Sequence, residues 1–98
     1  MKEKLTELGF VLRDDNSSFS HTYSKRKAER QGDMSINVSM NVDVEYEDIV
    51  EFRVGVSVMS HVCSLASVSM ELTGKDLTIE EYIKLAETFT KSVLVCLV

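Results

Sequence analysis

The chain has 98 residues, 44% hydrophobic and 28% charged, which predicts one folded domain over residues 1–98 and argues against a disordered protein. The net charge of −5 makes nucleic acid an improbable partner, because phosphate contacts need a surplus of lysine and arginine. Two cysteines are too few for a disulfide framework, and neither a signal peptide nor a membrane-spanning segment is evident, so we expect a cytoplasmic protein with no membrane partner.

The first third of the chain predicts a short helix and then a hairpin. Leu5 and Leu8 share one helical face, and Gly9 is suited to end that helix. Residues 10–12 begin an extended segment, and residues 19–24 alternate in polarity as a strand does. The Asp, Asn and Ser residues between these two segments favour a turn.

Residues 26–33 are polar and show no periodicity, which predicts a mobile connector. This segment and the residue before it contain the main group of positive charges. We treat that group as a candidate anion-binding site, composed of Lys25, Arg26, Lys27 and Arg30.

The clearest pattern is the strict alternation of apolar and polar residues from Met34 to Tyr46. A period of two excludes an amphipathic helix, whose apolar residues recur every three or four positions. The pattern predicts a strand about 40 Å long, which should bend or twist. Its inward residues would be Met34, Ile36, Val38, Met40, Val42, Val44 and Tyr46.

Two further strands continue the alternation. Residues 47–48 predict a tight connection to a strand whose inward residues are Val50, Phe52, Val54, Val56 and Val58. The next strand, over residues 62–72, would turn inward Ala66, Val68, Met70 and Leu72. Together these strands predict a meander.

A long helix ends the chain. Thr78 and Glu81 form a capping box, and Leu77 and Tyr82 are placed as a hydrophobic staple. The helix has an apolar stripe at spacings of three and four, namely Ile83, Ala86, Phe89, Val93 and Leu97. The predicted fold is therefore α+β, an antiparallel, meander-like sheet of about five strands with a short N-terminal and a long C-terminal helix packed on one face.

Two surfaces are candidates for binding. The acids near the 47–48 connection could contact a basic groove on a partner protein, although two solvated loop ends would show the same charges; these acids are Asp43, Glu45, Glu47, Asp48 and Glu51. Residues 93–98 are apolar on every side of the helix, so they are either covered within the monomer or in contact with another copy. We favour a homo-oligomer interface made of Val93, Leu94, Leu97 and Val98.

The sequence offers little chemistry. His61 and Cys63 lie on one face of a strand, but a zinc site needs three or four ligands and their spacing is too long for direct activation of the thiol. The paired acids all have structural explanations in turns or at a helix start. We therefore predict no catalytic residues, no metal and no cofactor.

The segment Leu8-Gly9-Phe10 with Asp14-Asp15-Asn16, followed at the other end by Thr78-Ile79-Glu80-Glu81-Tyr82, resembles small accessory proteins encoded by bacteriophages and mobile elements. The resemblance implies an inhibitor of a host or defence protein, acting through protein–protein contacts in the host cytoplasm. One alternative is an oligomeric sponge for a small nucleotide or anionic ligand. Another is similarity to acidic secretion chaperones, although their central helix is missing here.

Overall fold

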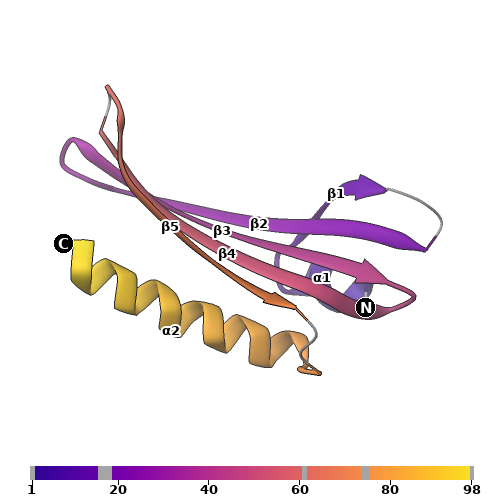
Figure 1. Ribbon diagram of the computed structural model, residues 1–98. Coiled ribbons are helices and arrows are strands. Elements are labelled where there is room, and N and C mark those ends of the chain that lie inside the picture. The colour runs from indigo at the N-terminus through magenta and orange to yellow at the C-terminus, as the bar shows by residue number, and fades with distance from the viewer. Residues whose placement is uncertain (1, 16–18, 61, 74–75, 98) are drawn as a thin grey trace.

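The computed structural model describes residues 2–15, 19–60, 62–73 and 76–97. Two helices flank five strands in chain order (Figure 1). The elements are α1 (Lys2–Glu7), β1 (Val11–Asp15), β2 (Ser20–Gln31), β3 (Met34–Glu45), β4 (Asp48–Ser60), β5 (Ser64–Thr73) and α2 (Ile79–Leu97).

The five strands form one antiparallel sheet in the order β1-β2-β3-β4-β5, so each strand pairs with its neighbour in the sequence. The long strands twist along their length, and α2 lies along one face of the sheet (Figure 1). We call this the inner face. The α+β meander with a short first helix and a long last helix is confirmed.

The predicted connector at residues 26–33 is wrong, because β2 continues to Gln31. Lys25 pairs with Met40, and the pairing continues to Gln31 opposite Met34. Gly32, with a φ of 65°, begins the turn into β3. The alternation was hidden because residues 25–30 are exposed on both faces of β2, so neither face selects apolar side chains.

The core lies between the inner face and the two helices. Phe52 of β4 stacks on Tyr82 of α2 with 5.2 Å between ring centroids, and burial raises the pKa of the Tyr82 phenol. The main cluster of buried residues is Leu5, Phe10, Tyr23, Val42, Val44, Phe52, Val54, Ile79, Tyr82 and Ala86. A second cluster of Ile36, Val56 and Val58 lies under the last turns of α2.

Two residues expected to point inward do not. The pairing of β3 with β4 shifts so that Val44 faces Ile49 while Asp43 faces Glu51. The extra residue, Val50, is exposed, and Ile49 packs against the core in its place. Tyr46 belongs to the turn after β3 and is also exposed.

The strand predicted over residues 62–72 is observed as β5, over Ser64–Thr73. Ala66, Met70 and Leu72 are half-buried on the inner face, as expected. Val68 remains exposed because β5 is an edge strand that α2 covers incompletely, and Val62 is exposed before the strand begins. Only part of the inward face of β5 therefore belongs to the core.

Polar contacts hold α1 in place. The Lys25 ammonium donates a 2.8 Å hydrogen bond to the Leu8 carbonyl, which satisfies an acceptor at the end of the helix. Lys4 forms an ion pair with Glu80 in the first turn of α2, and its hydrogen bond lowers the pKa of the Glu80 carboxyl below its ordinary value. The two helices thus meet at one end of the sheet.

The capping box predicted at the start of α2 is confirmed. The Thr78 amide donates to Glu81 Oε1 at 3.0 Å, and the Glu81 amide donates to Thr78 Oγ1 at 3.3 Å. We expect Thr78→Ala to lower the free energy of unfolding by about 1 kcal/mol, measured by urea denaturation, because one helix donor loses its acceptor.

Thr88→Ala is the matched control, since Thr88 donates to the Lys84 carbonyl within the helix and caps nothing. Alanine has the higher helix propensity, so this variant should be neutral or more stable by up to about 0.5 kcal/mol. Equal losses in the two variants would contradict the role of the cap.

Candidate protein-binding site

The acids predicted to bind a partner meet at one end of the sheet, where β3 turns into β4. Glu45 pairs with Asp48 across the last rung of the hairpin, and Asp43 pairs with Glu51 further along. Glu47 lies in the turn between the strands. We call these five residues the acidic tip.

One basic residue reduces the charge of the acidic tip. Arg53 Nη2 lies 3.6 Å from Asp43 Oδ2, and Arg53 Nε lies 3.7 Å from Glu51 Oε1. Asp43 also accepts a 2.8 Å hydrogen bond from the Thr22 hydroxyl. These two acids are therefore held on the sheet, whereas Glu45, Glu47 and Asp48 are exposed at the end of the hairpin.

The turn at the acidic tip has an unusual backbone. Tyr46 and Glu47 have φ values of 50° and 70°, the left-handed values that a two-residue type I′ turn requires. This turn strongly prefers Asn-Gly, and a side chain larger than asparagine in the left-handed region costs about 1–2 kcal/mol. The turn therefore places a tyrosine at the outermost point of the hairpin, at a cost in backbone strain.

That tyrosine stacks on a second aromatic ring. The centroids of Phe19 and Tyr46 are 4.7 Å apart, and the ring planes differ by 5°. The Tyr46 amide also donates a 3.0 Å hydrogen bond to the Phe19 carbonyl. Both rings remain accessible, with 42% of Phe19 and 72% of Tyr46 exposed. An ordered aromatic pair therefore stands beside the exposed acids.

Sequence reasoning identified the acids and missed the aromatic pair. Tyr46 continues the alternation of β3 by one position, so the pattern predicts an inward side chain. The turn reverses the chain at that position, and Phe19 is brought beside Tyr46 by the pairing of β2 with β3. The sequence contains little sign that Tyr46 lies in the turn, because this two-residue connection lacks the Asn-Gly or Asp-Gly that usually marks such a turn.

The predicted anion-binding residues do not converge. Neighbours in a strand point to opposite faces, and the partners of Lys25 and Lys27 are the inward-facing Met40 and Val38. Arg26 and Arg30 pair with Ser39 and Ser35, which face away from α2. The four cations are therefore divided between the two faces of β2, and Lys25 already caps α1.

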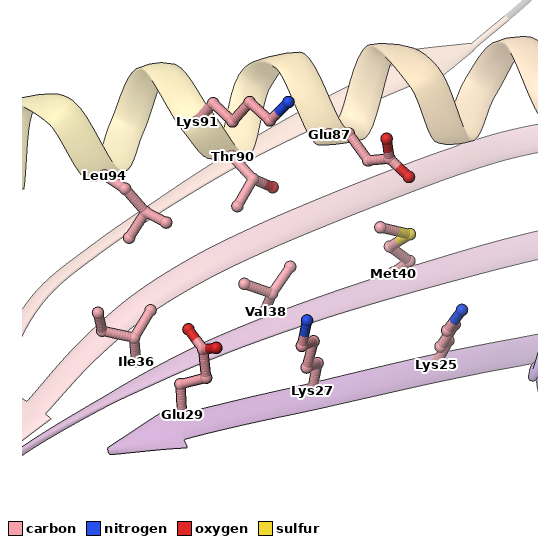
Figure 2. Close-up of a pocket in the computed structure, with 10 residues that line it drawn as sticks. All are labelled: Lys25, Lys27, Glu29, Ile36, Val38, Met40, Glu87, Thr90, Lys91 and Leu94. Carbon is pink, nitrogen blue, oxygen red and sulfur yellow. The ribbon is translucent and has the colours of Figure 1, made fainter. Parts of the chain in front are cut away.

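The two lysines line a groove between α2 and the strands β2 and β3 (Figure 2). Its volume is about 350 Å³. Its apolar lining consists of Ile36, Val38 and Met40 from β3 and Leu94 from α2 (Figure 2). The charged rim consists of Lys25, Lys27, Glu29, Glu87 and Lys91. The rim therefore carries both signs of charge, and binding of an anionic ligand there stays a prediction.

The predicted oligomer interface is partly used inside the molecule. Val93 and Leu94 are half-buried and pack against the cluster of Ile36, Val56 and Val58. The side chain of Leu97 and the whole of Val98 lie outside the described part of the chain. Val95 and Cys96 are the exposed residues of this last turn. The sheet thus covers Val93 and Leu94 of the apolar helix end, and oligomerisation through this end stays a prediction.

The remaining candidates, His61 and Cys63, belong to the connection between β4 and β5. His61 lies outside the described part of the chain, and Cys63 is exposed, with its Sγ 3.8 Å from the Ser60 hydroxyl. Among the described residues, no three His, Cys, Asp or Glu side chains are close enough to share a metal ion. No described helix has the length and apolarity needed to cross a membrane.

Comparison with known proteins adds no relative to this description. The chain matches no protein-family model, no curated protein and no solved structure.

The strain at the tip can be measured directly. We expect Glu47→Gly to raise the free energy of unfolding by about 0.5–1 kcal/mol in urea denaturation, because glycine adopts the left-handed conformation without a steric cost. Glu45→Gly, two residues earlier in β3, should lower it by a similar amount because glycine weakens a strand. A loss of stability in both variants would show that the turn stores no strain.

Proposed function

We propose that this protein is a non-enzymatic binding protein that contacts a basic surface of another protein through the acidic tip. The observation that carries the proposal is the exposed Phe19–Tyr46 stack beside Glu45, Glu47 and Asp48. Aromatic residues supply much of the binding energy at protein interfaces, and charged residues around them choose the partner.

The geometry of the stack supports binding rather than folding. A solvent-exposed tyrosine contributes less to stability than a buried one, yet Tyr46 is held in a strained turn. Strained backbone positions are retained most often where they serve a site, and an ordered aromatic ring loses little conformational entropy on binding. The stack is thus a pre-organised contact.

The charge of the tip defines the chemistry of the partner. Glu45 and Asp48 face each other across the hairpin, so like charges are held together. A partner surface containing arginine or lysine would relieve this repulsion, and arginine would also stack on the exposed Tyr46 ring. Long-range attraction would speed the encounter and weaken as salt rises.

In biological terms, we propose a phage-type inhibitor of a host protein. Such an inhibitor needs no active site, because it can occupy a basic functional groove of its target. The two cysteines, Cys63 and Cys96, are unpaired and exposed, which favours a reducing compartment such as the cytoplasm.

The test selects binders with the whole chain as bait. A displayed library of short random peptides is enriched on the wild-type protein, and the affinities of the selected peptides are then measured by titration calorimetry. We expect peptides rich in arginine and lysine, whose affinity falls about tenfold or more on Tyr46→Ala and on the paired change Glu47→Lys and Asp48→Lys.

The matched control is Glu29→Lys with Asp33→Lys, which changes the net charge equally at the opposite end of β3. If the loss of affinity comes from local contacts at the acidic tip, this control should bind the selected peptides within about twofold of the wild-type affinity. Peptides without basic residues, or equal losses in the control, would contradict the proposal.

A further inference from the structure

The two edges of the sheet differ in how they are protected. β1 pairs with β2 only from Ser24 to His21, so the rest of β2 is an open edge. That stretch carries Lys25, Arg26, Lys27, Glu29 and Arg30, and such charged side chains are what natural proteins use to prevent edge-to-edge pairing. β2 is therefore a guarded edge.

β5 is an edge of the opposite kind. Its ten residues, SLASVSMELT, contain no proline and one charged residue, Glu71. A shift in pairing at Val58 and Met59 disturbs the start of the strand, after which Ala66–Leu72 pair regularly with β4. An exposed strand that is long, regular and almost uncharged is a template for pairing with another strand.

The helix layer beside β5 is open as well. The groove lies on the side of α2 that faces β2, so helical periodicity places Leu85, Ser92 and Cys96 on the side that faces β5. Leu85 is 43% exposed, and Val68, on the inner face of β5, is 40% exposed. Apolar surface is therefore available on both layers at the same edge.

We infer that two copies of this chain associate through β5 to form one continuous ten-stranded antiparallel sheet. A two-fold axis perpendicular to the sheet and beside Ser67 sets each β5 antiparallel to its copy, so the unpaired backbone groups of one edge meet those of the other. The uncharged run from Ser64 to Met70 then faces itself without repulsion. The same operation at β2 would bring four basic residues of each copy together, which disfavours that edge.

The available surface is sufficient for a specific dimer. A ten-residue strand is about 33 Å long, and a sheet layer and a helix layer of about 10 Å each present a side about 20 Å deep. Their product is on the order of 600 Å² per copy, or about 1,200 Å² in total, at the lower limit of specific interfaces. The two-fold axis also leaves both acidic tips exposed, at opposite ends of the joined sheet.

The test is a charge exchange at β5, followed by light scattering after size-exclusion chromatography at about 100 μM protein, above the micromolar dissociation constants of weak interfaces. We expect the wild type at twice the chain mass of 11.1 kDa. Ser67→Lys with Ser69→Lys should be monomeric, and so should Ser67→Glu with Ser69→Glu, because like charges meet across the axis. An equimolar mixture of the two variants should return to the dimer mass.

Ser67→Thr with Ser69→Thr is the uncharged control and should remain a dimer, because threonine suits a strand. Circular dichroism of every variant checks that the monomer is folded. A monomeric wild type would overturn the inference. So would a dimer that survives both charged variants, or one that Val95→Asp alone dissociates, because the interface would then lie elsewhere.

Discussion

The structure depends on the packing of α2 against the inner face of β3 and β4. A hairpin of long strands is marginal by itself, because its apolar face would stay in water. The stacked pair of Phe52 and Tyr82 joins the sheet to the helix at the point where α1 also meets the core. The second cluster, under Val93 and Leu94, extends this contact along the helix. The acidic tip, the groove and the exposed edge at β5 all take their positions from this packing of α2 on the sheet.

The acidic tip follows from this arrangement. The bulge at Val50 changes the alternation of β4 by one position, so that Ile49 keeps its contact with the core up to the end of the hairpin. The hairpin must then close in two residues, and the residues available are Tyr46 and Glu47. Packing along the hairpin therefore imposes the strained turn, and the turn presents the tyrosine and the acids to solvent.

The open surfaces follow from the small size of the chain. One helix of nineteen residues covers β4 and its neighbours but cannot cover a sheet of five strands. The remaining inner face becomes the groove beside β2 on one side and the exposed edge at β5 on the other. A chain of 98 residues with such long strands leaves part of its apolar surface uncovered.

The sequence by itself determined the strands and the helix that bury one face and expose the other. The period of two from Met34 to Val44 and the capping box before α2 were sufficient, because burial and helix-end hydrogen bonds act on neighbouring residues. Tertiary structure alone decided the features that need a partner from another element. Residues 25–30 form a strand because their backbone pairs with β3, and this pairing divides the basic residues between the two faces of the sheet. Tyr46 points outward, where it stacks on Phe19. In each case the deciding contact joins residues far apart in the chain, which no local pattern contains.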